Sequence, residues 1–332
     1  MSVEIKTASI EPLRQTFDHV AARIGEGKPA SRYQEAVFDM QPKVNFHYRP
    51  TWEPELELYD VRRTAIKMVD FDLLLDPRQY YYAPYVIQRS KQQESQEKNF
   101  EFVEKRGLMD PIPEEWKEKI RKLIIPLRHM EWGANLNNYY IASYGYGTPI
   151  TSAASMQGMD RLGNAQYITR IGLALDKNNT GVLENAKEYW LNLDVWQPMR
   201  KLVEDSFVEK DWFELHVMQN FLLDGVIHPL AFDRFEHEVT QHGGAGFAML
   251  IEFMSDWYKE SARWTDATIK VAAAESAENK ALIEGWFAKW LPRVIEAVEP
   301  LTREAIGDKA DDFIESVISD LRARATKIKL EL

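Results

Sequence analysis

Cysteine is absent from all 332 positions of the chain. Its absence excludes disulfide bonds, thiolate metal sites and cysteine nucleophiles together. A chain without disulfides suits a reducing compartment, which favours the cytoplasm. Long apolar runs are missing too, because no stretch of about 18 apolar residues exists to cross a bilayer. The N-terminal sequence MSVEIKTASIEPLRQ has no apolar signal core, so we expect a cytoplasmic protein without a membrane partner.

Positive charge is outnumbered, with 41 Lys and Arg against 52 Asp and Glu. The net charge is −11 and no long basic block occurs, which argues against nucleic acid as a partner. Aromatic residues, in contrast, are abundant, with 10 Trp, 14 Tyr and 15 Phe. A chain of this length can bury a substantial core, and aromatic rings dominate both cores and subunit interfaces. The surplus predicts a large core together with an extensive partner surface.

Strand signals are few, whereas apolar residues recur at helical spacing along most of the chain. No repeat with a fixed period of about 20–50 residues is present. We therefore predict an all-α bundle. Pro229 is expected to end one helix, and Pro300 with Gly307 to separate the last two. Helices are predicted over residues 9–25, 32–40, 81–106, 113–144 with a kink at Pro126, 150–176, 183–193, 195–208, 212–226, a segment reaching 241, 247–280, and two segments within 281–332.

The segment 41–58 lacks a helical period and contains three prolines and several aromatics. Unstructured loops of this length are uncommon in compact domains. An extended arm laid across another subunit explains the aromatics better than a surface loop does, although both interpretations stay open. The chain is accordingly divided into residues 1–58 as N-terminal helices and arm, 59–280 as the helical bundle, and 281–332 as C-terminal helices packed on it.

A further absence concerns histidine, because none of the seven His residues has Asp or Glu three positions before it. Di-iron bundles of the ferritin-like type carry an inward Glu-x-x-His on each of two helices. Two distant helical stretches, 156–164 and 253–260, look like such helices but carry other residues. Their ligand positions read Arg161 and Asn164, then Trp257 and Glu260. The pattern predicts a ferritin-like bundle that lacks the di-iron ligands.

These residues suggest how the bundle replaces the metal. A cation at Arg161 cannot share a pocket with iron, and the indole of Trp257 would fill the vacated volume. If both point inward, Arg161 and Glu260 could pair across the centre. The alternative places Arg161 on a solvated face.

Three stretches carry a family resemblance: YDVRRTAIKMVDFDLLLDPRQYY at 59–81, MEWGANLNNYY at 130–140 and SMQGMDRLGNAQ at 155–166. They are similar to the β subunit of the hydroxylase component of bacterial multicomponent monooxygenases, closest to the phenol hydroxylase branch and its toluene monooxygenase relatives. The resemblance covers nearly the whole chain. It implies a ribonucleotide-reductase-like bundle whose paralogous α subunit holds the di-iron centre.

The resemblance also implies site positions in this chain. The arm is expected to contact the α subunit through Tyr48, Arg49 and Trp52. No catalytic, cofactor-binding or metal-ligating residue is expected here. The vacated ligand positions fall near Ala134, Arg161, Asn164, Leu223, Trp257 and Glu260.

The implied assembly is a dimer of αβγ protomers that hydroxylates phenols with O₂. Electrons come from NADH through a reductase carrying FAD and a 2Fe–2S cluster, and a small regulatory protein assists. Two alternatives remain. One is a stand-alone enzyme with an atypical metal site at Asp224, His228 and Glu260, and the other is a helical adaptor protein.

Overall fold

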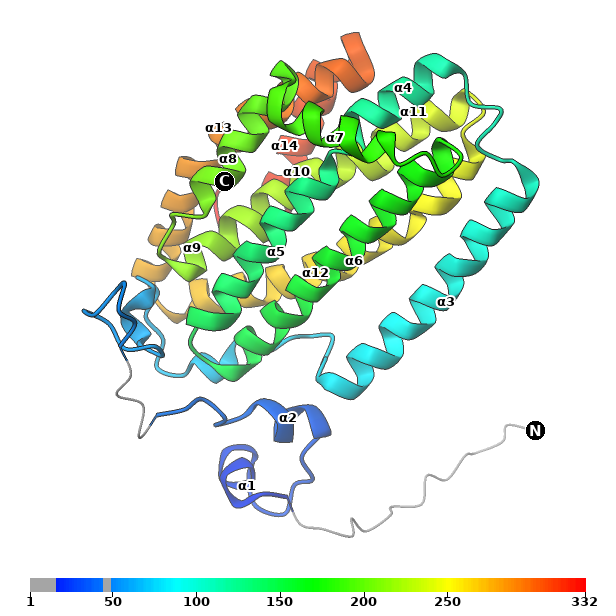
Figure 1. The fold of residues 1–332 in the computed structure, drawn as a ribbon. Helices are drawn as coiled ribbons and strands as arrows, with labels where there is room; N and C mark the ends of the chain where they lie inside the picture. Colours follow the sequence, from blue (N-terminus) through cyan, green and yellow to red (C-terminus); the bar gives the residue numbers. More distant parts are fainter. Residues whose placement is uncertain (1–15, 44–48) are drawn as a thin grey trace, which may run out of the picture.

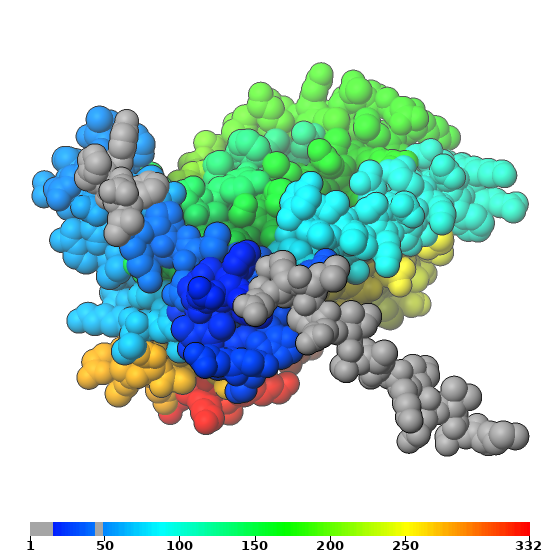
Figure 2. All heavy atoms as spheres, turned by 90° about the horizontal axis from the view of Figure 1, so that it is seen from below, coloured from blue at the N-terminus to red at the C-terminus, as the bar shows by residue number. Residues whose placement is uncertain are grey.

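The computed structural model describes residues 16–43 and 49–332. Every regular element in these ranges is helical, which confirms the all-α prediction. Long helices form one bundle, and the short α1 and α2 lie below it (Figure 1). Seen from below, α1 and α2 rest on one end of the bundle (Figure 2). Among the described residues, no helix is both long enough and apolar enough to cross a membrane.

The helices of the bundle are joined by short connections, and several junctions contain a single 3₁₀ turn. The α-helices are α1 (Asp18–Ile24), α2 (Arg32–Val37), α3 (Tyr82–Arg106), α4 (Glu114–Leu123), α5 (Leu127–Tyr144), α6 (Thr148–Leu175), α7 (Gly181–Asn192), α8 (Gln197–Ser206), α9 (Trp212–His216), α10 (Asp224–Pro229), α11 (Phe235–Gln241), α12 (Ala245–Glu275), α13 (Ala277–Ile306) and α14 (Ala310–Lys327). The 3₁₀ turns are η1 (Val61–Arg63), η2 (Phe71–Leu73), η3 (Asp194–Trp196) and η6 (Gly307–Lys309). Two π-helical segments, η4 (Val217–Leu223) and η5 (Leu230–Arg234), flank α10.

Helix ends follow local chemistry. Gly107 ends α3 in the left-handed conformation, with φ of 61°, which glycine adopts without a Cβ clash. The predicted helix 247–280 is interrupted at Ser276, where the backbone is extended. The hydroxyl of Ser276 accepts from the backbone N–H of Asn279 and caps the next helix. One predicted helix is therefore two.

The prolines did not end helices as predicted. Pro229 lies inside a continuous helical run from Trp212 to Gln241, and Pro300 lies inside α13, whose end is at Gly307. An internal proline costs roughly 3 kcal/mol of helix stability. Residues 212–228 are buried along their whole length, and the packing of this run outweighs the local cost. The π turns on either side of α10 mark where the regular register is disturbed.

One hydrophobic core extends from Ile66 to Leu330. A second, small cluster joins α1 and α2. The hydroxyl of Tyr33 in α2 accepts from the N–H of Asp76, and this bond at 2.8 Å ties the small cluster to the bundle. The predicted boundary at residue 281 falls inside α13, whose side chains belong to the larger core.

Candidate functional site

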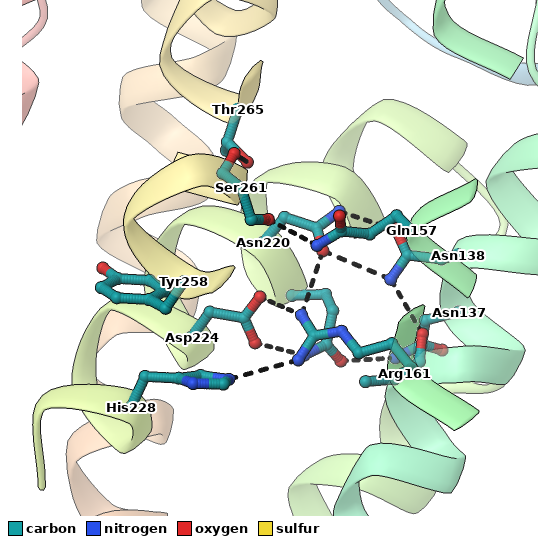
Figure 3. Close-up of polar contacts among 12 residues, drawn as sticks. Asn137, Asn138, Gln157, Arg161, Asn220, Asp224, His228, Tyr258, Ser261 and Thr265 are labelled. Atoms are coloured by element: carbon teal, nitrogen blue, oxygen red, sulfur yellow. Dashed lines mark hydrogen bonds and ion pairs between the residues drawn. The ribbon is translucent and has the colours of Figure 1, made fainter. Parts of the chain in front are cut away.

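A closed polar centre lies between α5, α6, α10 and α12 (Figure 3). Its central residue is Arg161 of α6, whose side chain has no exposed surface. Nη1 of Arg161 donates to both carboxylate oxygens of Glu131 in α5, each at 3.3 Å. Nη2 donates to Oδ2 of Asp224 in α10. Charge-assisted bonds of this kind are the stronger class of hydrogen bond, so one arginine joins buried acids from two helices.

Two rings complete the surroundings of this guanidinium. Cζ of Arg161 lies 4.7 Å from the centroid of the Trp257 ring, within cation–π range. Nε2 of His228 lies 3.4 Å from Nη1 of Arg161 and 3.6 Å from Oε1 of Glu131. The His228 ring stacks on Tyr258 with centroids 5.1 Å apart. The cation is thus held by carboxylates, an imidazole and an indole at once.

Burial and charge act in opposite directions on this centre. Burial alone would raise the pKa of Glu131, but the charge of Arg161 and the contact with His228 bring that pKa below its usual range. Burial likewise disfavours the charged guanidinium, yet Asp224 and Glu131 raise the pKa of Arg161 above its usual value. The ion pairs therefore stay charged in the interior.

A chain of buried amides extends the centre. Oδ1 of Asn220 accepts from Nη2 of Arg161 at 3.5 Å, and Asn220 exchanges amide hydrogen bonds with Asn138 at 3.1 and 3.3 Å. Asn220 also donates to Nδ1 of His216 at 3.0 Å, while Nε2 of His216 lies 2.9 Å from the hydroxyl of Thr268. Because an amide NH₂ can only donate, Nδ1 accepts and the ring is neutral. Burial lowers the pKa of His216 to about 3.

A second charged cluster contacts Trp257 at its indole N–H. Nε1 of Trp257 donates to Oδ2 of Asp160 at 2.9 Å. Arg89 of α3 donates to both oxygens of Asp160, at 2.7 and 2.8 Å. The hydroxyl of Tyr85 donates to Oδ1 of the same carboxylate at 2.8 Å. The indole of Trp257 therefore contacts both clusters, through its ring face at Arg161 and through its N–H at Asp160.

Glu260 belongs to this second cluster, so the predicted pair of Arg161 with Glu260 is wrong. Glu260 accepts from Arg89 at 2.9 Å and lies 3.6 Å from Arg78. Glu260 follows Trp257 by three residues in α12. The large, fully buried ring of Trp257 occupies the space toward the centre. The side chain of Glu260 keeps 14% of its surface exposed, whereas Arg161 has none.

Five of the six predicted ligand positions are buried inside the bundle, and three of them bring a polar or aromatic side chain to the centre. Arg161, Asn164 and Trp257 are buried, and the interpretation that put Arg161 on a solvated face is wrong. Nδ2 of Asn164 lies 3.5 Å from Oε2 of Glu131. Trp257 occupies the central volume as predicted.

The two other predicted positions, Ala134 and Leu223, are buried but bring no polar group to the centre. The acids that contact Arg161 are instead Glu131 and Asp224, which the sequence interpretation missed in this role. Glu131 stands three residues before Ala134, so both share one face of α5. Asp224 directly follows Leu223. An acid one helical turn away from one expected ligand position, and another adjacent to a second, was the signal in the sequence that could have identified these two residues.

The donor set does not fit a di-iron centre, which needs about four carboxylates and two imidazoles. Two acids and one imidazole meet here, and a guanidinium already supplies their positive partner. In ranges 16–43 and 49–332 no three His, Asp or Glu residues are grouped to hold a metal. The alternative site of Asp224, His228 and Glu260 is not assembled, because the arginines of the second cluster hold Glu260.

The predicted contact arm is partly within the described residues. Residues 49–58 contain no helix. Arg49 is exposed and donates to the carbonyl of Pro54 at 3.2 Å, and Trp52 keeps 74% of its surface exposed. Tyr48 lies outside the described residues. A largely exposed tryptophan is available for contact with another molecule.

Comparison with known proteins identifies the family of this chain. The family model for methane, phenol and alkene hydroxylases matches residues 52–276. The chain belongs to this hydroxylase family. It is 47% identical over 331 residues to the oxygenase component DmpL of phenol 2-monooxygenase from Pseudomonas sp. strain CF600, covering 100% of this chain and 99% of the relative. It is 42% identical to the oxygenase component MhpL of phenol 2-monooxygenase from Acinetobacter pittii strain PHEA-2, covering 100% of this chain and 98% of that one.

Solved structures give the same result for the fold. A chain of phenol hydroxylase from Pseudomonas sp. OX1, crystallised under xenon pressure, superposes with a TM-score of 0.92 at 46% identity, covering 99% of both chains. A chain of toluene 4-monooxygenase superposes with a TM-score of 0.76 at 22% identity, covering 90% of this chain and 99% of that one, which shows a shared fold alone. The predicted resemblance to phenol hydroxylase and the predicted ferritin-like bundle are confirmed.

Proposed function

We propose that this chain is the non-catalytic structural β subunit of the hydroxylase of an NADH-dependent phenol monooxygenase. The observation that carries the proposal is the buried centre, where Arg161 binds Glu131 and Asp224 and Trp257 fills the remaining space. A centre neutralised in this way has no place for O₂ chemistry on iron. Oxidation of phenols with O₂ then occurs in the α subunit, which holds the di-iron centre.

The proposed assembly is a dimer of αβγ protomers in the cytoplasm. The γ subunit is small, and a regulatory protein with a reductase completes the system. The reductase carries FAD and a 2Fe–2S cluster and takes electrons from NADH. The support for this assembly is that two similar proteins are oxygenase components of phenol 2-monooxygenases.

An apolar face on α5 and α6 supports a scaffolding role. Trp132 and Leu136, one turn apart on α5, are 54% and 39% exposed, and Met159 of α6 is 42% exposed. The amide of Asn135 donates to the carbonyl of Gly158 at 2.7 Å, so the two helices are closely packed. They run side by side, and none of the described helices crosses in front of them in this view (Figure 1). Exposed apolar faces of this kind mark sites of association, and we propose that the α subunit covers this one.

The experiment is co-purification of the full chain with its α subunit on size-exclusion chromatography. Trp132→Asp places a charge in the centre of the face and is expected to weaken association roughly tenfold or more, as loss of an aromatic anchor does. Val69→Asp is the matched control, because Val69 is 96% exposed and lies on another part of the surface. Equal association of both variants would contradict the proposed face.

The arm is tested separately. Trp52→Ala and deletion of residues 1–58 are each expected to reduce association with the α subunit, because the arm is proposed to lie on that subunit. The circular dichroism spectrum should show that the shortened chain keeps its helices. Association unchanged after the deletion would contradict the role of the arm.

A further inference from the structure

We propose that residues 3–7 dock on residues 66–70 of the same chain as an added β-strand, held by main-chain hydrogen bonds. The edge that would receive this strand is described by the structure, whereas residues 3–7 lie outside the described residues. The inference goes beyond the proposed function, because it concerns a contact within this chain and not its association with the α subunit.

The receiving segment, residues 64–70, joins η1 to η2 without a helix. Both of its ends have an extended backbone, with φ of −142° at Thr64 and −143° at Asp70. Ile66 is buried between Ala65 and Lys67, which are both exposed. Side chains alternate between two faces in this way along a β-strand. The segment therefore resembles a single strand on the surface of a helical protein.

One edge of this segment is closed by side chains. The N–H of Lys67 donates to Oδ1 of Asn279 at 3.1 Å, and the carbonyl of Lys67 accepts from Nδ2 of Asn279 at 2.8 Å. The N–H of Val69 donates to Oε1 of Glu275 at 2.9 Å. The amide of Asn279 thus takes the position that the main chain of a neighbouring strand has in a sheet.

The opposite edge is open. The main-chain groups of successive strand residues point to opposite edges, so those of Ile66, Met68 and Asp70 point away from Asn279. The N–H of Ile66 donates to the hydroxyl of Thr64 at 3.2 Å. The N–H groups of Met68 and Asp70 have no hydrogen-bond partner among the described residues. An edge with free main-chain donors is a template for another strand, and a strand added there would satisfy both donors.

The sequence contains a segment suited to this edge. Apolar and charged residues alternate from the third position, in the order Val3, Glu4, Ile5 and Lys6. A period of two predicts a half-buried strand. Val3 and Ile5 would then share the inner face with Ile66. Glu4 would lie on the outer face, where Lys67 offers the opposite charge.

Helix α1 brings these residues close to the edge. Arg23 of α1 forms an ion pair with Asp70, the last residue of the edge. Thr16 precedes Arg23 by seven residues that are mostly helical, so the two lie within roughly 15 Å of each other. Residues 8–15 can extend over up to roughly 25 Å. The chain is therefore long enough for residues 3–7 to reach the edge from their own α1.

The experiment is residue-resolved amide hydrogen exchange by NMR, on the full-length chain and on a chain that lacks residues 2–8. We expect the amides of Met68 and Asp70 to exchange at least about tenfold more slowly in the full chain. The amides of Lys67 and Val69 should exchange equally in both, because their side-chain partners remain. This alternation distinguishes main-chain pairing from a segment that merely covers the surface.

Point variants test the same strand without shortening the chain. Ile5→Pro removes a main-chain donor in the middle of the added strand. It is expected to speed exchange at Met68 and Asp70 as the deletion does. Ile5→Val is the matched control and should keep both amides protected. Circular dichroism verifies that each variant keeps its helices.

Dilution identifies the source of the strand. Docking within one chain predicts exchange rates that stay the same on about tenfold dilution. Protection of Met68 that falls with dilution would assign the strand to a second copy and overturn the inference. Equal exchange at Met68 and Asp70 with and without residues 2–8 would overturn it as well, and so would equal changes at all four amides. These measurements do not involve the α subunit, so their failure leaves the proposed function to its own test.

Discussion

The two charged clusters that contact Trp257 differ in how they balance charge. In the inner cluster, Arg161 serves both Glu131 and Asp224, and all three side chains are at most 1% exposed. In the outer cluster, Arg89 pairs with Asp160 and Glu260, while Arg78 pairs with Asp76 and lies near Glu260. The side chains of Arg89 and Glu260 are each 14% exposed. The inner cluster depends on one cation, whereas the outer one has a second cation and contact with water. The difference shows that buried carboxylates with a single cationic partner depend on that one residue for their stability.

The largest expected effect comes from breaking the inner cluster. Arg161→Met removes the shared cation and should lower the free energy of unfolding by about 3–5 kcal/mol, because two buried carboxylates lose their partner. Urea denaturation at pH 7 measures it. A loss below that of the corresponding Arg89 variant would show that the inner cluster is not the more dependent one.

The matching change in the outer cluster should cost less. Arg89→Met is expected to lower the free energy of unfolding by about 1.5–3 kcal/mol, the range for hydrogen bonds to charged groups. Asp160 keeps its bonds from Trp257 and Tyr85, and Glu260 keeps Arg78 nearby. The same urea titration compares the two variants directly. Equal losses would remove the distinction between the clusters.

A pH series tests how closed the inner region is, through His216, which Asn220 connects to Arg161. The pKa of His216 is lowered to about 3 in the folded chain, against about 6.5 when unfolded. The unfolded chain therefore binds a proton between these values that the folded chain does not. This contribution to stability is complete above pH 6.5 and is lost as the pH falls toward 3.

Between pH 7 and pH 5 the contribution of His216 to the free energy of unfolding should fall by about 2 kcal/mol. His216→Gln keeps a polar side chain without a titrating ring, so its stability should fall less over this range. His129→Gln provides a comparison at a half-buried histidine, whose pKa is lowered by burial to about 4. A pH dependence equal in wild type and His216→Gln would contradict a neutral, closed environment.

The smallest effect is expected at Glu260. Glu260→Gln removes a charge that remains partly in contact with water, and its amide oxygen can still accept from Arg89. We expect a change below about 1 kcal/mol in the free energy of unfolding. Asp224→Asn is the matched inner variant and should cost more. If Glu260→Gln lowers the free energy of unfolding as much as Asp224→Asn does, the inner cluster is not the more sensitive of the two.

Sequence reasoning predicted the helical architecture from the helical spacing of apolar residues. It placed Arg161 and Trp257 at expected ligand positions, and of the two interpretations left open for Arg161 the inward one is correct. It assigned Glu260 as the partner of Arg161 because both stood at expected ligand positions. Glu260 pairs with Arg89 instead, and α3, which carries Arg89, was not expected to contribute a partner at this position.

Asp224 of the inner cluster was missed because of the helical phase before it. η4 is a π-helical segment with a bond from the N–H of Asp224 to the carbonyl of Gln219, so the register before α10 differs from that of a regular α-helix. As a result, Asp224 contacts Arg161 at the centre, whereas the buried Leu223 at the expected ligand position contributes no polar group. The sequence contains no reliable sign of a π turn. Pro229 was misjudged for the related reason that burial of the whole run outweighed its local preference.

The iron content of the full chain, expressed without its α subunit and incubated with Fe²⁺ and O₂, tests the central claim most directly. A centre whose positive charge is a guanidinium should take up no stoichiometric iron and show no oxo-bridged absorption. A bound pair of irons with an oxo-bridged spectrum in this chain would contradict the account.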